Sequence, residues 1–273
     1  MTDRYAVIGN PISHSKSPQI HLMFAKQTGE NISYEAIKPP VSLAETIDQM
    51  RNDPDYKGCN VTVPYKHQAY KLSDEFTFEV GFAHAANTLE FQNGRIKAHN
   101  TDGIGLLRDI EQNLHINIKN KKILLLGAGG AAKGAATAIA SLHSGASLVI
   151  ANRTVERALE LARTCSPLIK ARGISYVELR DESFDVIINA TSAELTNGEI
   201  PLPETIFAPG ALAYDLMYGR ETLFMKFALM QGIGKELVVD GLGMLVEQAA
   251  ESFFIWRGIR PETASVIAAL RQS

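Results

Sequence analysis

The stretch Ile123-Leu-Leu-Leu-Gly127-Ala-Gly129-Gly130-Ala-Ala132 decides how this chain folds. An apolar run typical of a buried strand leads directly into a glycine-rich turn and then into a helix of small residues. Gly127 permits the tight turn, Gly129 lets the backbone approach a pyrophosphate, and Ala132 lets the helix pack closely on the strand. A second apolar run, Ser147–Ala151, follows as a βαβ unit requires. We therefore expect a dinucleotide to be held by the residues of the turn: Gly127, Ala128, Gly129, Gly130, Ala131 and Ala132.

The residues after the second run indicate which dinucleotide binds. An NAD site usually has Asp or Glu about 20 residues beyond the glycines, where the carboxylate holds a ribose hydroxyl. Here the chain reads Asn152-Arg153-Thr154, without an acid, and Arg157 follows one helical turn later. Arg153 offers a planar, permanently charged fork for a 2′-phosphate, and Thr154 can donate its hydroxyl. This pattern predicts NADP; the alternative is that Arg153 and Thr154 only begin a solvated helix, with Thr154 as N-cap.

The composition is that of an ordinary globular protein and excludes several functions. Hydrophobic residues make up 45% and charged residues 21% of 273 residues, which is enough for two domains. A formal net charge of −3 gives no basic face for nucleic acid. No apolar run approaches the roughly 20 residues of a membrane span, and the first residues have no signal-peptide pattern. Cys59 and Cys165 lack metal-type spacing, so we expect no metal site and a cytoplasmic location.

The order of apolar runs predicts an α/β protein with two domains. We expect an α/β substrate domain from residues 1–104 and 241–273, and a Rossmann-type, doubly wound NADP domain from residues 105–240. A helix over Leu106 to Gln112 is expected to cross to the nucleotide domain. A last helix, Leu242 to Gly258, places Met244 and Gln248 on one face and is expected to return to the first domain. The crevice between the two domains is the default active site.

A first polar cluster, Gly9 to Pro18, lies after the first strand. Ser17 is placed as N-cap and Pro18 as the first residue of a helix. Two hydroxyls beside a helix N-terminus, those of Ser15 and Ser17, make a cradle for a carboxylate. Simple capping would also explain Ser17, although it leaves Ser15 without a role.

Two further clusters contain groups that can act in catalysis. In Asn60-Val-Thr62-Val-Pro64-Tyr-Lys66, strand alternation puts Asn60 and Thr62 on one face, and Pro64 starts a turn or helix that presents Lys66. The other cluster is Asn100-Thr101-Asp102-Gly103. Each has a simpler explanation: a lysine after a strand is usually solvated, and Asp102 could only cap the crossing helix.

Taken together, these clusters closely resemble the shikimate dehydrogenase family over the whole chain. The stretches that carry the resemblance are Gly9–Pro11 with His14–Pro18, Asn60–Lys66, Asn100–Gly103, Gly127–Ala131, Asn152–Thr154, Asn189–Ser192 and Asp240–Met244. The resemblance implies NADP-dependent reduction of 3-dehydroshikimate to shikimate, in the biosynthesis of aromatic amino acids.

The resemblance also implies roles for individual residues. Lys66 and Asp102 are the catalytic pair. The substrate-binding residues are Ser15 and Ser17 for the carboxylate, and Thr62, Asn87, Asp102 and Gln248 for the hydroxyls. Beside the nicotinamide or the substrate it places Leu216, Tyr218 and Gly241, with Thr191 as a further cofactor residue.

The side chains of Lys66 and Asp102 also suit the reduction of a carbonyl by their own chemistry. As hydride reaches the C3 carbonyl, negative charge grows on its oxygen and a proton donor must meet it. Lys66 can supply both the charge and the proton, and Asp102 can orient Lys66. The residues alone leave open which of the two finally delivers the proton.

Three positions depart from the family pattern, and two other functions remain as alternatives. The family commonly has an acid, Val and Gly where this chain has His67, Ala86 and Glu194. One alternative is a quinate/shikimate dehydrogenase that also accepts NAD, against which Arg153 argues. The other is a non-catalytic NADP-binding regulator, against which the intact pair of Lys66 and Asp102 argues. Either a monomer or a homodimer is compatible with the sequence.

Overall fold

The computed structural model describes residues 2–143, 145–191 and 200–272. Contacts divide the chain into two compact units, Met1–Gly105 with Leu245–Ser273, and Leu106–Met244. The expected boundaries, after residues 104 and 240, lie close to these. Both observed boundaries fall inside helices, α5 (Asp102–Arg108) and α9 (Leu242–Arg257), so the chain changes unit within a helix and not in a linker.

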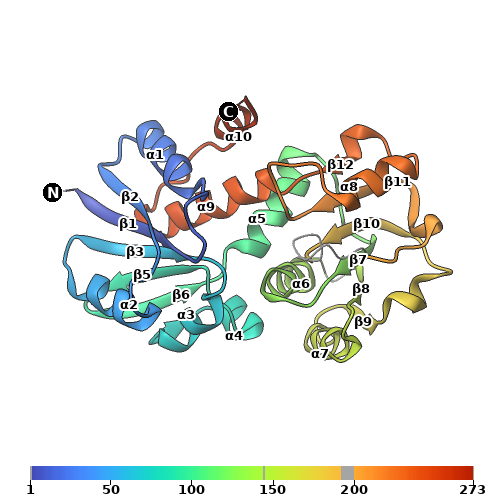
Figure 1. Cartoon of the computed structure of the whole chain (residues 1–273), viewed down its shortest axis with the longest axis horizontal. Coiled ribbons are helices and arrows are strands. Elements are labelled where there is room, and N and C mark those ends of the chain that lie inside the picture. Colours follow the sequence, from blue (N-terminus) through green and yellow to red (C-terminus); the bar gives the residue numbers. More distant parts are fainter. Residues whose placement is uncertain (1, 144, 192–199, 273) are drawn as a thin grey trace. The chain divides into compact units, whose positions relative to one another are not determined.

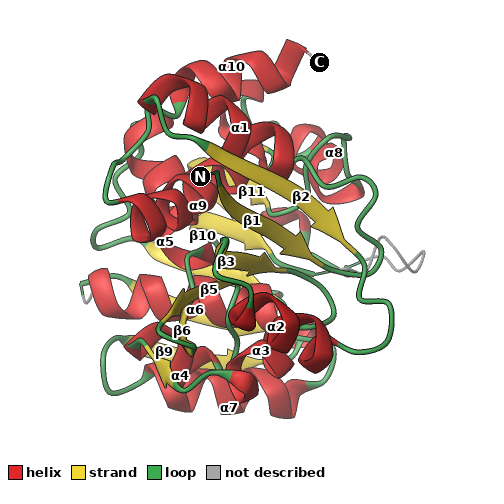
Figure 2. Ribbon diagram, turned by 90° about the vertical axis from the view of Figure 1, so that its left-hand side faces the viewer, coloured by secondary structure: helices red, strands yellow, loops and turns green. Residues whose placement is uncertain are grey.

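The first unit contains a mixed six-stranded sheet in the order β2-β1-β3-β5-β6-β4 (Figure 2). The strands β2, β1 and β3 are parallel, whereas β5 is antiparallel to both β3 and β6. The strands are β1 (Asp3–Ile8), β2 (Ile32–Ile37), β3 (Tyr56–Val61), β4 (Glu75–Phe76), β5 (Thr88–Gln92) and β6 (Arg95–His99). The helices are α1 (Ser17–Thr28), α2 (Leu43–Asn52), α3 (Lys66–Leu72), α4 (Phe78–Ala83) and α10 (Ala264–Gln272). The unit also includes α5 up to Gly105 and α9 from Leu245 onward.

Helix α2 illustrates how the local sequence directs packing in this unit. Ser42 accepts a hydrogen bond from the Glu45 amide at 3.2 Å and so caps the helix. Leu43, Ile47 and Met50 recur at helical spacing and are buried in the core beneath the sheet.

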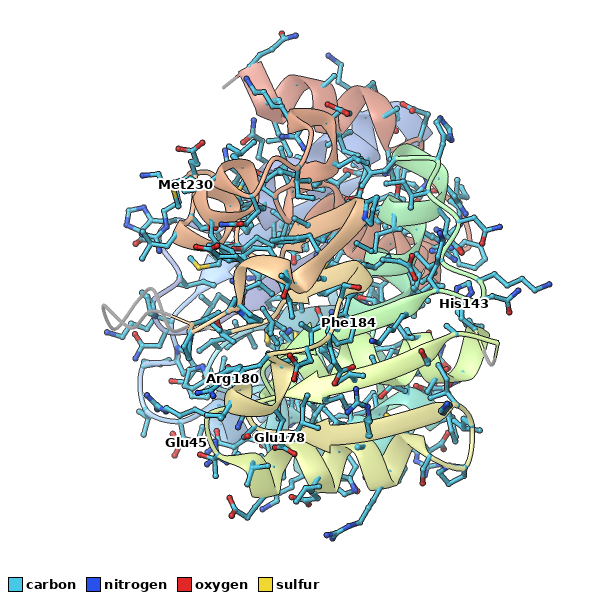
Figure 3. All side chains as sticks on the ribbon, turned by 90° about the vertical axis from the view of Figure 1, so that its right-hand side faces the viewer. Glu45, His143, Glu178, Arg180, Phe184 and Met230 are labelled. Atoms are coloured by element: carbon cyan, nitrogen blue, oxygen red, sulfur yellow. The ribbon has the colours of Figure 1, made fainter. Side chains whose placement is uncertain are left out.

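The second unit contains a fully parallel six-stranded sheet in the order β12-β11-β10-β7-β8-β9 (Figure 1). This order is that of the doubly wound dinucleotide-binding fold. The strands are β7 (Lys122–Leu126), β8 (Ser147–Ala151), β9 (Lys170–Ile174), β10 (Phe184–Asn189), β11 (Phe207–Asp215) and β12 (Val238–Val239). The helices are α6 (Gly130–Leu142), α7 (Val155–Cys165) and α8 (Leu223–Met230). Phe184, at the beginning of β10, is fully buried in this core (Figure 3).

The two long helices differ from the sequence-based expectation at their ends. The crossing helix begins at Asp102, earlier than expected, because Asn100 Oδ1 accepts from the Asp102 amide at 3.2 Å. It continues into a turn of π-helix over Asp109–Asn113. The last helix ends at Arg257 and not at Gly258, which has a φ of +71° and stops it in the left-handed region.

Candidate functional site

Lys66 and Asp102 form the central pair of the first unit. Each is the first residue of its helix, Lys66 in α3 and Asp102 in α5. Lys66 Nζ lies 2.5 Å from Asp102 Oδ2, and the two side chains are 19% and 8% exposed. The pair is therefore mostly shielded from water. In such a partly desolvated site a charge acts more strongly on its neighbours than it does on an exposed surface.

The amide of Asn87 links this pair to α9. Asn87 Oδ1 accepts from the Thr101 backbone N–H at 2.8 Å, which fixes the orientation of the amide. Asn87 Nδ2 must then face the other way, where it donates to Asp102 Oδ1 at 2.9 Å and to Gln248 Oε1 at 3.2 Å. The structure thus brings together Lys66, Asn87, Asp102 and Gln248, four of the residues expected at the site.

A buried polar network lies behind Asn87, and the sequence analysis did not identify most of it. Asn60 Nδ2 donates to the Asn87 carbonyl, to Thr88 Oγ1 and to Ser252 Oγ, at 3.0 to 3.1 Å. Tyr34 donates its hydroxyl to Asn60 Oδ1 at 2.7 Å. Asn60 was noticed only for its place on the strand, and nothing in the local sequence pairs it with Ser252, 192 positions later.

Ser15 and Ser17 lie together, but the capping role expected for Ser17 is wrong. Helix α1 begins at Ser17 itself, its N-cap position is Lys16, and no side chain caps it there. Instead Ser15 Oγ accepts from the Ser17 amide at 3.3 Å and donates to Ser17 Oγ at 3.2 Å. Ser17 is thus the first residue of the helix and Pro18 the second, and the hydroxyl that satisfies a helix N–H is that of Ser15.

Thr62 follows β3 and is half-buried against the turn after β1. A Cβ at Gly9 would lie 2.5 Å from Thr62 Cγ2, so only glycine fits there. Thr62 donates its backbone N–H to the Ile8 carbonyl at 2.9 Å, and Asn10 donates to the Val63 carbonyl at 3.0 Å. The turns after two neighbouring parallel strands are thereby fixed side by side.

The glycine turn after β7 has the form that a dinucleotide requires. Gly127 has a φ of +105°, and a Cβ there would lie 3.1 Å from the Ala190 carbonyl oxygen. Gly129 and Gly130 are exposed, and among the described residues nothing lies within 4 Å of the point where a Cβ would be. Within the described part of the chain, the space beside these glycines is open, so the start of α6 can offer its first N–H groups and the positive end of its dipole to an anion. Ala128, Ala131 and Ala132 adjoin the two glycines in the sequence.

The expected ribose-phosphate residues follow β8. Thr154 occupies the N-cap position of α7, as the alternative of simple capping expects, although its side chain makes no capping hydrogen bond there. Asn152 Nδ2 donates to the Thr154 carbonyl at 2.8 Å and shapes the turn. Arg153 and Arg157 are both exposed. Two guanidinium groups thus remain available for an anion.

The remaining expected cofactor residues follow β10, β11 and β12. Thr191 comes after β10, Leu216 after β11 and Gly241 after β12. Gly241 donates its N–H to the Met217 carbonyl at 2.8 Å, and a Cβ on Gly241 would overlap the Leu216 carbonyl. Since carboxyl ends of parallel strands meet at one edge of a sheet, these residues share the edge with the glycine turn. Burial raises the pKa of Tyr218 in the same unit.

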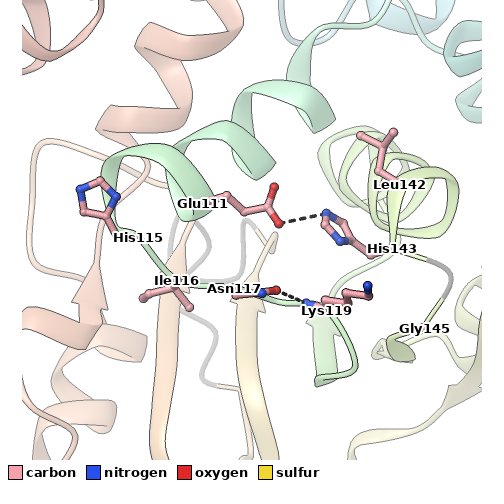
Figure 4. A pocket seen from close by; sticks show the side chains of 8 residues that line it. All are labelled: Glu111, His115, Ile116, Asn117, Lys119, Leu142, His143 and Gly145. Carbon is pink, nitrogen blue, oxygen red and sulfur yellow. Dashed lines mark hydrogen bonds and ion pairs between the residues drawn. The ribbon is translucent and has the colours of Figure 1, made fainter.

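A different cavity of the second unit, of about 660 Å³, lies away from these residues (Figure 4). Glu111, Asn117, Lys119 and His143 line it, and His143 Nε2 lies 3.3 Å from Glu111 Oε1. The segments around it precede β7 and β8, whereas the glycine turn follows β7. This cavity is therefore at the amino ends of the strands and contains none of the expected site residues. Among described residues, no group of three His, Cys, Asp or Glu side chains is arranged to hold a metal.

Comparison with known proteins shows where the chain belongs. Residues 7–89 match the model of the shikimate dehydrogenase substrate binding domain, residues 109–197 that of shikimate / quinate 5-dehydrogenase, and residues 241–271 that of the shikimate 5′-dehydrogenase C-terminal domain. The NADP(+) shikimate dehydrogenase of Methylobacillus flagellatus is 51% identical, covering 98% of this chain and 99% of its own. The chain belongs to the shikimate dehydrogenase family. The resemblance inferred from the sequence and the α/β two-domain fold are thereby confirmed.

Two solved structures superpose on the chain over nearly its full length. The Ael1 enzyme from Pseudomonas putida gives a TM-score of 0.91 at 46% identity, covering 98% of both chains. Shikimate 5-dehydrogenase from Thermus thermophilus in complex with NADP(H) and shikimate gives 0.85 at 32% identity, covering 99% of both chains.

Two of the three departures from the family pattern can be placed. His67 Nδ1 lies 2.9 Å from the His84 carbonyl, which can only accept, so this ring nitrogen carries the proton. Ala86 is fully buried and donates its N–H to the Lys66 carbonyl at 2.9 Å. Both contacts join the start of α3 to the segment before Asn87. Glu194 lies outside the described residues.

Proposed function

We infer that the chain is an NADP-dependent shikimate dehydrogenase, an oxidoreductase that reduces 3-dehydroshikimate to shikimate and catalyses the reverse reaction. The observation that carries this inference is the pair of Lys66 and Asp102 joined at 2.5 Å and bonded through Asn87 to Gln248. The NADP(+) shikimate dehydrogenases that are about half identical to the chain support the same activity. The enzyme would act in the shikimate pathway of aromatic amino-acid biosynthesis.

The residues of the second unit fit NADP. The pyrophosphate would be held by the turn of Gly127 to Ala132, where the backbone is open and the α6 dipole favours an anion. The 2′-phosphate would be held by Arg153, with Thr154, Asn152 and Arg157 beside it. Thr191, Leu216 and Gly241 would hold the nicotinamide end, since they share the carboxyl edge of the sheet.

The first unit would bind the substrate. Ser15 and Ser17 present two hydroxyls at the start of α1, which suits the carboxylate. Thr62, Asn87, Asp102 and Gln248 supply donors and acceptors for the ring hydroxyls. We also propose Tyr218 as a substrate-binding residue.

The reaction needs a proton at the C3 oxygen when the carbonyl is reduced. Bound NADPH supplies the hydride. Lys66 meets the negative charge that grows on the oxygen and donates a proton to it. Asp102 holds the Lys66 ammonium in place, and Asn87 in turn holds Asp102 through its fixed amide. In the oxidation of shikimate, Lys66 takes the hydroxyl proton back.

A four-way assay tests this function. Initial rates are measured with shikimate or quinate as substrate and with NADP or NAD as cofactor, by the absorbance of the reduced nicotinamide. We expect kcat/KM to be largest for shikimate with NADP. Comparable rates with quinate and NAD would favour a quinate/shikimate dehydrogenase, and no turnover with any combination would favour a regulatory protein.

The setting of the enzyme is also a proposal. Cys59 and Cys165 are both free and buried, as in a protein of the reducing cytoplasm, and burial raises the pKa of Cys165 to about 12. None of the described helices is both long and apolar enough to span a bilayer. We propose a monomer or homodimer in which no nucleic acid takes part; light scattering after gel filtration would distinguish the two states.

A further inference from the structure

A buried carboxylate at the end of β11 has no place in the mechanism above. Asp215 is the last residue of β11, and its side chain is completely buried. Its Oδ1 accepts from the Met217 backbone N–H at 2.9 Å. Its Oδ2 accepts from Asn189 Nδ2 at 3.0 Å and from the Thr222 hydroxyl at 2.6 Å. One carboxylate therefore joins the end of β10, the turn after β11 and the start of α8.

The partner amide, that of Asn189, is fixed from its other side. Asn189 Oδ1 accepts from the Thr191 backbone N–H at 3.1 Å and from the Thr191 hydroxyl at 2.8 Å. A backbone N–H can only donate, so the oxygen of Asn189 must face Thr191 and its NH₂ group must face Asp215.

The two fixed ends decide what kind of group can stand at position 215. The chain of bonds starts at one backbone N–H, that of Met217, and ends at another, that of Thr191. Asn189 lies between these two ends and turns its NH₂ group toward residue 215. Only a side chain that accepts hydrogen bonds with both of its terminal atoms therefore fits at position 215. An ionised carboxylate does so, whereas an amide would have to turn its NH₂ group toward a donor.

The segments that Asp215 holds are those that we assign to the cofactor. Leu216 donates its N–H to the Asn189 carbonyl at 2.9 Å, and Gly241 donates to the Met217 carbonyl at 2.8 Å. The Leu216–Met217 backbone is thus held by Asn189 at Leu216 and by Gly241 at Met217. Thr191 is held through Asn189.

We propose that Asp215 is a positioning residue for the nicotinamide end of the NADP site. Its carboxylate holds the Leu216–Met217 backbone directly, and it holds Thr191 through the amide of Asn189. This proposal rests on the assignment of Thr191, Leu216 and Gly241 to the cofactor.

Two exchanges of acid and amide test the proposal. Asp215→Asn breaks the bond pattern, and we expect NADP to bind 10- to 100-fold more weakly, measured by calorimetric titration of the full-length enzyme. The double variant Asp215→Asn with Asn189→Asp exchanges the acid and the amide between the two positions, so that the carboxylate now stands at residue 189. The amide of residue 215 can then donate to the carboxylate of residue 189 and to the Thr222 oxygen, while the N–H groups of Met217 and Thr191 keep their acceptors. Only the Thr222 hydroxyl hydrogen loses its acceptor. We expect NADP affinity within about threefold of that of the wild type.

Asn189→Asp alone provides a pH-dependent version of the same test. Two carboxylates would then face each other across a 3.0 Å bond, and they need a shared proton to replace the lost amide hydrogen. We expect NADP affinity to fall as the pH rises, and the wild type to lack this dependence. This variant also keeps the proposal testable if Asp215→Asn does not fold.

A control variant separates positioning from stability. Thr222→Val removes one donor to Asp215 and the cap of α8, yet both backbone N–H groups keep their acceptors. It should lower the melting temperature but leave NADP affinity within twofold. In all four variants the KM for shikimate at saturating NADP should change less than twofold, because the shikimate residues assigned to the first unit are untouched.

Two results would overturn the proposal. One is a folded Asp215→Asn enzyme with wild-type NADP affinity; the other is a double variant no better than Asp215→Asn. Failure of the proposed function would look different, since the wild type would then not oxidise shikimate with NADP at all.

Discussion

Replacing Lys66 by Met is the perturbation that most directly tests the chemistry. Met keeps an unbranched side chain of similar length and removes the charge and the proton. Asp102 then keeps its bond from Asn87 but loses the donor that lies 2.5 Å from Oδ2. The side chains of this pair are 19% and 8% exposed, so the environment is that of a partly desolvated site.

The expected loss follows from the charge that develops in the reaction. At an effective dielectric constant of about 20, two unit charges about 4 Å apart interact by about 4 kcal/mol. An ammonium beside a developing oxyanion thus accounts for about three decades in rate, at about 1.4 kcal/mol per decade. A positioned proton donor typically contributes about 10² to 10⁴. We therefore expect Lys66→Met to lower kcat by about 10³, with little change in the KM for shikimate.

Asp102→Asn should behave differently from Lys66→Met. Both oxygens of Asp102 accept, one from Lys66 and one from the fixed amide of Asn87, so an amide at this position must turn its NH₂ group toward a donor. We expect a lower kcat together with a higher KM for shikimate. The double variant should be little worse in kcat than Lys66→Met, because the two residues act as a unit.

Steady-state kinetics of shikimate oxidation, followed by NADPH absorbance, measure all three variants. Lys71→Met, which removes the exposed lysine from the same helix, is the matched control and should keep the wild-type kcat. A Lys66→Met enzyme with nearly normal kcat and a greatly raised KM would refute the reasoning, since Lys66 would then only bind the substrate.

Three further outcomes follow from the structure. Arg153→Ala should raise the KM for NADP by about one to two decades and leave that for NAD almost unchanged, because a charged hydrogen bond contributes about 1.5 to 3 kcal/mol; an equal effect on both cofactors would contradict the assignment. Ser15→Ala and Ser17→Ala should both weaken shikimate binding in calorimetry, but only Ser15→Ala should also lose up to about 1 kcal/mol of stability in urea unfolding, since Ser15 accepts from the Ser17 amide. Burial lowers the pKa of His21 to about 3, from an ordinary value of 6.5, so the unfolded chain binds more protons below pH 6.5 and stability is lost as the pH falls. Between about pH 7 and pH 5 this loss should be about 2 kcal/mol in urea unfolding, and identical pH slopes for the wild type and His21→Leu would exclude His21 as its source.

The sequence by itself determined the features that depend on neighbouring residues. The turn at Gly127 needs a φ of +105° and no Cβ, and this requirement is visible as a glycine after an apolar run. Strand β8 has the bounds of the apolar run Ser147–Ala151 that predicted it. The glycine turn and Asn152 to Thr154 could be predicted as cofactor residues because each follows the end of a strand, and parallel strands bring such ends to one edge. Thr191, Leu216 and Gly241 were expected only from the resemblance to the family.

The tertiary structure alone decided the contacts between segments distant along the chain. Lys66 and Asp102 are 36 positions apart, and Asn87 and Gln248 are 161 positions apart, so no local pattern states that they meet. The same holds for Asp215, whose carboxylate is required by the orientation of Asn189, 26 positions earlier. Helix and strand preferences act over a few residues, whereas the direction of a buried hydrogen bond depends on which donors the packed fold leaves facing each other. For this reason the sequence could suggest the residues that we propose to act on substrate and cofactor, whereas the hydrogen bonds around those residues became visible only in the folded chain.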